Sequence, residues 1–190
     1  MTNDKILNAL SEIHPLHDTV KKKLIACMSE RTLTRHEHLL SLNETCKHLY
    51  FINEGFVRIY YYKHGKDITE YFAGEKQFCF SINSYFAQSP SKLMIQALED
   101  SRITLIPKSE LDRLRAQYLD LANLVTEMFS LSLMLSQERM DSIQFESAAQ
   151  RYRRLLKEQP QILNKASLQH IASYLGITAE TLSRIRTQVF

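Results

Sequence analysis

The stretch SLQHIASYLGITAETLSRIRTQ, Ser167 to Gln188, decides how the rest of the chain is interpreted. Ser167 suits the N-cap of a helix, and Gly176 is the residue best able to adopt the left-handed conformation that ends one. Thr178 then suits the N-cap of a second helix. The apolar residues fall on one face of each segment, Leu168, Ile171, Ala172 and Leu175 in the first and Leu182, Ile185 and Val189 in the second. Two short helices joined through a glycine turn are typical of a helix-turn-helix.

The remaining face of the second helix carries side chains that suit contact with DNA, namely Ala179, Glu180, Ser183, Arg184 and Thr187. An arginine can bridge O6 and N7 of guanine, a glutamate can accept from N4 of cytosine, and hydroxyls can bind phosphates. Residues 147–190 also contain seven Lys and Arg against two Asp and Glu, a net charge of +5 in a chain of +3 overall. The charge alone would equally fit a solvated basic surface.

The 190 residues are enough for one mid-sized domain and a small module, and 44% hydrophobic and 24% charged residues are ordinary for a globular protein. No continuous apolar run approaches the roughly 18 residues of a membrane span, and the N-terminus has no apolar signal core. A cytoplasmic protein without a membrane partner is therefore expected. Cys27, Cys46 and Cys79 are scattered and lack a CxxC pair, which favours buried thiols over a disulfide framework, a zinc site or an iron–sulfur cluster.

Short aromatic and β-branched runs between residues 33 and 107 predict antiparallel strands. Turn residues separate these runs and predict three hairpins, with turns at 53–55, 63–66 and 99–101. Several short strands at regular spacing indicate a small sandwich or barrel. Two short helices are expected to cover it, residues 3–13 and 19–29.

From Lys108 onward the period changes to that of a helix, with no Gly or Pro through residue 144. Ser109 suits its N-cap, with Asp112 three residues later. Apolar residues then alternate at spacings of three and four and form a seam of Leu121, Leu124, Met128, Leu131 and Leu135. The same helix of a second subunit would bury this seam, so a homodimer is expected. The alternative is that the seam packs back against the barrel.

The segment IASYLGITAETLSRIR, Ile171 to Arg186, closely resembles the C-terminal DNA-binding module of the Crp/Fnr family of cyclic-AMP-receptor-type transcription regulators. The resemblance extends over nearly the whole chain and implies an α+β protein. Its parts would be a cyclic-nucleotide-binding-like β-roll (jelly roll) sensor in residues 1–117, a dimerisation helix in residues 118–145, and a winged-helix-like helix-turn-helix in residues 146–190. The wing is expected to be absent, since the sequence stops at Phe190. The implied partners are double-stranded DNA, a second copy of the chain and RNA polymerase.

By this resemblance Glu180 and Arg184 take the positions of base-reading residues. Ala179 stands where relatives often have a third reader, an arginine, and alanine offers at most contact with a thymine methyl group. Ser183 lies on the same face. The positions that touch phosphates in relatives are Ser167, Gln169, Thr178 and Thr181, although helix capping explains Ser167 and Thr178 equally well.

The resemblance also implies a ligand pocket in the roll, but the residues that bind cyclic nucleotides are missing. The Gly-Glu and Arg-Ser pairs of cyclic-nucleotide-binding relatives fall near Cys79-Phe80 and Ser91-Lys92. Lysine is a poor substitute for an arginine that holds a phosphate with two hydrogen bonds. We expect no dependence on cyclic AMP or cyclic GMP and no cofactor. If an effector exists, we expect it to be small and partly apolar, in a pocket formed by Phe80, Ser84, Tyr85, Ser91 and Lys92.

Other chemistry finds little support in the sequence. His36 and His38 lie two residues apart without further clustered ligands, which favours a polar edge over a metal site. No nucleophile and base or acidic dyad stands at a meaningful spacing, so an enzyme is not expected. Two functions stay open: a sequence-specific transcription regulator, and a ligand- or protein-binding roll whose helix-turn-helix no longer reads DNA. Glu180 and Arg184 favour the first.

Overall fold

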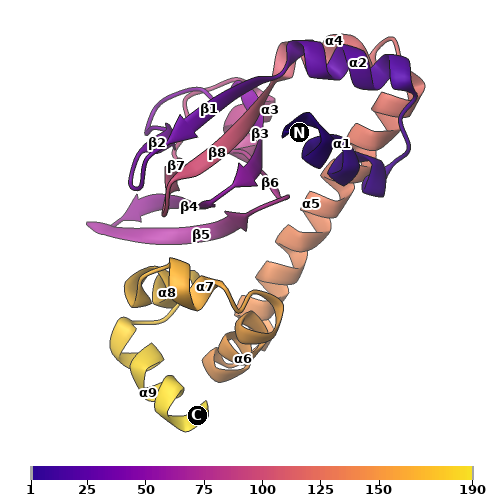
Figure 1. Ribbon diagram of the computed structural model, residues 1–190. Coiled ribbons are helices and arrows are strands. Elements are labelled where there is room, and N and C mark those ends of the chain that lie inside the picture. The colour runs from indigo at the N-terminus through magenta and orange to yellow at the C-terminus, as the bar shows by residue number, and fades with distance from the viewer. Residues whose placement is uncertain (1, 190) are drawn as a thin grey trace.

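The computed structural model describes the backbone of residues 2–189 and the side chains of residues 4–187. Within these residues the chain forms two N-terminal helices, two β-sheets, a long helix and a C-terminal group of short helices (Figure 1). The N-terminal helices, α1 (Thr2–Ile13) and α2 (Asp18–Cys27), lie where the sequence predicts them. This mixture of helices and antiparallel sheets confirms the α+β class.

The described strands form two four-stranded antiparallel sheets that share one apolar core. One sheet has the order β1-β8-β3-β6 and the other the order β2-β7-β4-β5. The helix α3 (Ile82–Ala87) follows β6 in the chain. The strands are β1 (Ser29–Leu33), β2 (His38–Leu40), β3 (His48–Glu54), β4 (Phe56–Lys63), β5 (Lys66–Gly74), β6 (Phe78–Cys79), β7 (Met94–Ala97) and β8 (Ser101–Pro107).

Two of the three predicted hairpins are wrong. The turn at 63–66 does join the paired strands β4 and β5, with Lys63 opposite Lys66. The turns at 53–55 and 99–101 instead carry the chain from one sheet to the other, because β3 and β8 lie in one sheet and β4 and β7 in the second. The two corners pack together: a Cβ on Gly55, whose φ is +101°, would lie 2.2 Å from Ser101 Oγ. This close approach leaves no room for a side chain at residue 55, which explains the glycine. The two predicted hairpins are therefore corners at which the chain crosses between the sheets of the β-roll.

The predicted long helix begins later than expected. Residues Lys108–Arg115 form a separate helix, α4, and α5 runs from Leu119 to Phe145. The N-cap of α4 is Pro107, so Ser109 lies inside the helix and does not cap it. Tyr118 has extended backbone angles and separates the two helices. They separate because α4 packs on α2 and β8, while α5 leaves the sheets at a different angle (Figure 1).

Within the described residues, α5 is the one helix whose length and composition would suffice to cross a membrane. The sequence predicted no segment long and apolar enough to span a membrane, because only continuous apolar runs were considered. In α5, Ser and Thr interrupt the apolar residues but add no charge, so the helix passes a test of length and average hydropathy. A single such helix is weak evidence for a membrane span. The first turns of α5 belong to the core of the β-roll through Leu121, Leu124 and Val125.

The C-terminal helices are α6 (Ala148–Glu158), α7 (Ile162–Lys165), α8 (Leu168–Tyr174) and α9 (Ala179–Val189). They enclose a second apolar core that contains Tyr152, Leu155 and Leu182. Phe56, Phe72 and Leu98 of the β-roll join the same core. The C-terminal helices are therefore docked on the sheet of β4 and β5, close to the far end of α5 (Figure 1).

Candidate nucleic-acid interface and interdomain cavity

Helices α8 and α9 are joined as the sequence predicts. Ser167 Oγ accepts a hydrogen bond from His170 N at 3.1 Å and caps α8. Gly176 has φ +70°, the left-handed conformation that few other residues adopt without strain. Thr178 Oγ1 accepts from Thr181 N at 3.2 Å at the start of α9. The caps and the glycine fix the angle between the two helices, which is what a helix-turn-helix requires.

The outer face of α9 is polar and free of the core. Leu182 is fully buried and Ile185 is 8% exposed, so these residues anchor the helix. Val189, predicted to face inward, lies outside the described side chains. Among the predicted DNA-contacting residues, Ala179 and Thr181 are half-buried, whereas the exposed ones are Ser167, Gln169, Thr178, Glu180, Ser183 and Arg184.

Glu180 and Arg184 differ in how freely they could reach a base. Hydrogen bonds from its own backbone N–H and from Thr178 lower the pKa of Glu180, so the carboxylate stays ionised as an acceptor. The Arg184 Nη2 group makes one contact, with Thr181 Oγ1 at 3.3 Å. Among the described side chains this is the one hydrogen bond that the Arg184 guanidinium makes, and its charge also interacts with that of Glu180, so several of its donors stay available to a ligand.

The structure corrects the predicted dimer seam. Leu121 and Leu124 are buried in the core of their own protomer, and Met128 is half-buried against it, so the alternative that the seam packs on the barrel holds for this part. Leu131 and Leu135 are exposed. A second stripe with the same alternation of four and three runs along α5: Phe129, Leu133, Ser136, Met140 and Ile143. Phe129 is half-buried, and Phe129, Ser136 and Ile143 also line the cavity described below, at the border between it and the exposed side of the helix. Leu133 and Met140 are 71% and 62% exposed, more than Leu131 or Leu135.

Most of the predicted pocket residues have other roles. Ser84 Oγ accepts from Cys46 N and donates to Ser89 O, and Ser91 Oγ contacts Ser81 Oγ and Leu93 O. Tyr85 is buried, with its ring against Phe80 and Phe86. Lys92 is exposed. Of the five predicted residues, Phe80 alone lines the cavity described next.

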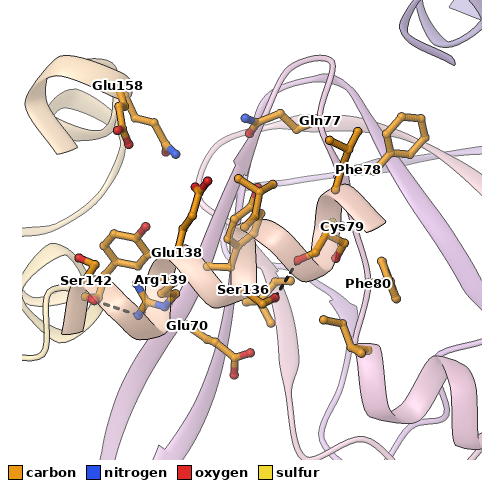
Figure 2. Close-up of a pocket in the computed structure, with 18 of the residues that line it drawn as sticks. Glu70, Gln77, Phe78, Cys79, Phe80, Ser136, Glu138, Arg139, Ser142 and Glu158 are labelled. Atoms are coloured by element: carbon orange, nitrogen blue, oxygen red, sulfur yellow. Dashed lines mark hydrogen bonds between the residues drawn. The ribbon is translucent and has the colours of Figure 1, made fainter. Parts of the chain in front are cut away.

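A cavity of about 440 Å³ lies where the β-roll, α5 and the C-terminal helices meet. Its volume is in the range that holds small-molecule ligands. Figure 2 shows the segment Phe78–Phe80 toward one end and Arg139, Ser142 and Glu158 toward the other. The first end is mostly apolar, with Leu49, Ile59, Phe80, Leu93, Met128 and Phe129. The second is polar, with Glu70, Glu138, Arg139, Arg151, Arg154 and Glu158.

Two arginines at the polar end hold the turn between α8 and α9. Arg139 Nη2 donates to Tyr174 O at 3.0 Å, and its guanidinium lies 4.1 Å from the centre of the Tyr174 ring. Arg151 Nε donates to Leu175 O at 3.1 Å. A third, Arg154, pairs with Glu146 at 3.2 Å. Sequence reasoning missed this arrangement, because it considered the basic residues of 147–190 only as net charge and the contacts join residues 24 and 35 positions apart.

Polar contacts also join the β-roll to α8. Thr69 N donates to Ser173 Oγ at 3.1 Å, and Asp67 lies 2.9 Å from Arg58 and 3.9 Å from His170 Nε2. Burial, reinforced by Arg58, lowers the pKa of His170, while Asp67 partly opposes the shift. Several buried polar atoms in this contact have no described hydrogen-bond partner: Arg58 Nη1, Asp67 Oδ1, Thr69 Oγ1 and His170 Nδ1. Such atoms make the contact less stable than its area suggests.

No group of three or more His, Cys, Asp or Glu in the described part of the chain could hold a metal ion. His38 Nε2 instead bonds the Tyr60 hydroxyl at 2.8 Å. Burial raises the pKa of Cys46 and Cys79, which keeps both thiols protonated. These groups therefore serve as packing and hydrogen-bonding residues.

Comparisons with known proteins agree with this architecture. Residues 30–118 match the family model of the cyclic nucleotide-binding domain. No curated protein sequence matches the chain. FixK2 of Bradyrhizobium japonicum has a similar structure, with a TM-score of 0.73 and 20% identity, over 85% of this chain and 84% of that one.

Two further structures are similar over more of the chain. A Eubacterium rectale protein assigned to the Crp/Fnr family of transcriptional regulators has a TM-score of 0.71 and 21% identity, over 92% of this chain and 84% of that one. The catabolite activator protein of Thermus thermophilus has a TM-score of 0.59 and 17% identity, over 95% and 86%. The fold is thus a β-roll joined by a long helix to a helix-turn-helix. Residues 30–118 match the cyclic nucleotide-binding domain, and the chain has the fold of the Crp/Fnr transcription regulators, as its sequence predicted.

Proposed function

We propose that the protein is a cytoplasmic transcription regulator of the Crp/Fnr type that binds double-stranded DNA in a sequence-specific way. The observation that carries the proposal is the outer face of α9, where Glu180, Ser183 and Arg184 are exposed while Leu182 is fully buried. A helix that served packing alone would not need this combination of an ionised acceptor and an exposed guanidinium on one face. RNA polymerase is the second macromolecular partner that this function requires.

The proposed active form is a homodimer through α5. The second stripe of α5 has the residue spacing of a seam between two helices: Phe129, Leu133, Ser136, Met140 and Ile143. Leu133, Met140 and Ile143 are exposed, and contact between such large apolar side chains and water is unfavourable. Phe86 of α3 is 52% exposed and lies 4.9 Å, centre to centre, from the Phe129 ring, so the apolar surface continues onto the β-roll. A second α5 would cover the stripe, and two copies of α9 would then be related by a two-fold axis.

Selection of binding sites from random duplex DNA by the full-length protein tests this function. We expect enrichment of a two-fold symmetric site whose half-sites lie about 10 base pairs apart, or a multiple of that, because two recognition helices must enter the major groove on one side of the duplex. Enrichment of no sequence, with equal affinity for all duplexes, would instead favour a roll that binds a ligand or protein and has lost DNA reading.

A further inference from the structure

The cavity between the β-roll, α5 and the C-terminal helices carries positive charge that the protein does not neutralise. Arg139 and Arg151 donate to the carbonyl oxygens of two consecutive residues, Tyr174 and Leu175, so their guanidinium groups converge on one turn. Among the described side chains, neither arginine has a carboxylate oxygen within 4 Å, in contrast to Arg154 and its partner Glu146. Both arginines are half-buried.

The acidic residues of the same cavity offset this charge only in part. Glu138 and Glu158 are exposed, so water solvates their carboxylates. Glu70 is half-buried, and burial raises the pKa of its carboxyl even though Arg139 opposes the shift. Burial thus disfavours the ionised form of Glu70, which makes this carboxyl a weaker counter-charge than an exposed one.

We propose that this cavity binds an amphipathic small molecule with an acidic head group. The head, a carboxylate or similar oxyanion, lies between Arg139 and Arg151, and the apolar body extends along α5 toward Phe80, against a wall to which Phe129 and Leu93 contribute. Figure 2 shows Arg139 and Phe80 toward opposite ends of the cavity. Charge complementarity selects the head, because two guanidinium groups can donate to one oxyanion. The apolar wall selects the body, because burial of hydrocarbon against it removes both from water.

Such a ligand would contact the sensor and the DNA-binding helices at once. Arg139 and Arg151 hold the turn that precedes α9, so an oxyanion between them competes with or reinforces that hold directly. This regulatory consequence rests on the proposed function in DNA binding. The binding of the ligand itself does not, and it is measured without DNA.

Isothermal titration of the full-length protein with decanoate, decanamide and decylammonium, all below their micelle concentrations, tests the proposal. The three probes share the apolar body and differ in the charge of the head. We expect decanoate to bind once per chain, and decanamide and decylammonium to bind about tenfold or more weakly, since a charge-assisted contact is lost. Arg139→Gln should weaken decanoate by about the same factor and leave decanamide unchanged, whereas Arg153→Gln, an exposed arginine of α6, should change neither.

Equal affinities for decanoate and decanamide would overturn the proposal, and so would unchanged decanoate binding in an Arg139→Gln protein that keeps its melting temperature. If Arg139→Gln does not fold, Ser132→Phe decides the question. Ser132 lines the cavity away from the arginines, so the larger side chain should abolish decanoate binding by filling the apolar part. Retained binding in a folded Ser132→Phe protein would place the decanoate elsewhere and reject the site.

Discussion

Arg184 is exposed on α9, one turn after Glu180, with one hydrogen bond to Thr181. We predict that Arg184→Ala weakens binding to the selected DNA site by about 1 to 3 kcal/mol, because a bidentate contact with guanine is lost. Binding to random duplex DNA should change little. Fluorescence anisotropy with labelled duplexes of both kinds, at one fixed salt concentration, measures the difference.

Arg153→Ala is the matched control, since Arg153 is exposed on α6 with no ion pair among the described side chains. It should affect both duplexes slightly and equally. Equal losses on the two duplexes with Arg184→Ala would assign Arg184 to phosphate contact and contradict base reading. Arg151 and Arg154 are unsuitable controls, because they hold Leu175 O and Glu146 in the folded protein.

Residues whose role depends on near neighbours in the chain could be predicted from the sequence. Ser167 and Thr178 cap helices, and Gly176 has positive φ, because all three roles depend on a few adjacent positions. The roles of Arg139 and Arg151 could not, because their partners lie 35 and 24 residues away and are main-chain carbonyls, which leave no trace in side-chain patterns.

The exposed stripe of α5 makes a prediction at the scale of the element. Leu133→Asp combined with Met140→Asp should give monomers, because two charges would have to be buried in the proposed helix pair. The same protein should lose affinity for its selected site. Sedimentation equilibrium measures the mass, and thermal unfolding verifies that the protomer still folds.

Leu135→Asp is the control, since Leu135 is also exposed but lies about 200° around the helix from Leu133 at 100° per residue. It should leave the dimer intact. A dimer that survives Leu133→Asp/Met140→Asp and dissociates with Leu135→Asp would restore the originally predicted face.

The contact between β5 and α8 should weaken in acid. Burial and Arg58 hold the pKa of His170 below its ordinary value of 6.5, and Asp67 partly opposes them, while His36 adds to the shift. The unfolded protein therefore binds this proton more readily than the folded one, so the contribution of His170 to stability is present at neutral pH and is lost as pH falls below about 6.5. We predict that His170→Gln makes the melting temperature fall less steeply with acid than in the original protein.

His64→Asn in the exposed turn between β4 and β5 is the control for this measurement, and it should leave the slope unchanged. Identical slopes for the original protein and His170→Gln would show that the histidine adapts to protonation without cost, and the prediction would fail.

Helices were predicted better than strand pairing, for a physical reason. Helical periodicity and capping are local, so α1, α2, α8 and α9 were found at nearly their observed bounds. The segments around Gly55 and Ser101 contain ordinary turn residues, and such residues serve equally well when a chain reverses within a sheet or crosses to another. Only the packing of the two corners on each other distinguishes the cases, and that contact joins residues far apart in sequence.

For the whole molecule, we predict that cyclic AMP and cyclic GMP do not bind at micromolar concentrations. The Cys79-Phe80 and Ser91-Lys92 pairs provide no arginine for the cyclic phosphate, and Ser91 Oγ is already hydrogen-bonded to Ser81 and Leu93. The arginines that line the cavity come from α5 and α6 instead. A cyclic phosphate that reached them would leave its sugar and base in the apolar end with unpaired groups, each costing about 1 to 3 kcal/mol. Losses of this size remove most of the roughly 8 kcal/mol of a micromolar affinity.

Isothermal titration with each nucleotide, together with anisotropy on the selected DNA in its presence and absence, tests the prediction. A micromolar or tighter dissociation constant with improved DNA binding would show that a rearranged set of residues replaces the missing arginine. Decanoate is titrated in parallel as the reference ligand. If decanoate binds and the nucleotides do not, the protein has an intact cavity that rejects nucleotides; if neither binds, the cavity itself does not bind ligands.

The order of sensor, long helix and helix-turn-helix was predictable, because each part has its own periodicity and composition. Their docking was not. Lys165 pairs with Glu99 at 2.5 Å and Thr69 bonds Ser173, contacts that span 66 and 104 residues. The cavity lies between the same two parts of the chain that these contacts join. A pocket formed jointly by the β-roll, α5 and the C-terminal helices has no sequence motif of its own. The predicted pocket therefore fell mostly on residues that make hydrogen bonds and packing contacts within the β-roll.

The hydrogen bonds from Arg139 and Arg151 to the carbonyls of Tyr174 and Leu175 affect how a movement of α5 would reach α9. Arg139 belongs to α5 and Arg151 to α6, and both donate to the end of α8, so these hydrogen bonds link the three helices to the turn before α9. A rotation of α5 about its own axis would therefore carry α9 with it. In the proposed dimer such a rotation would change the spacing between the two copies of α9, and the contacts of Arg139 and Arg151 would set how much of the rotation reaches them.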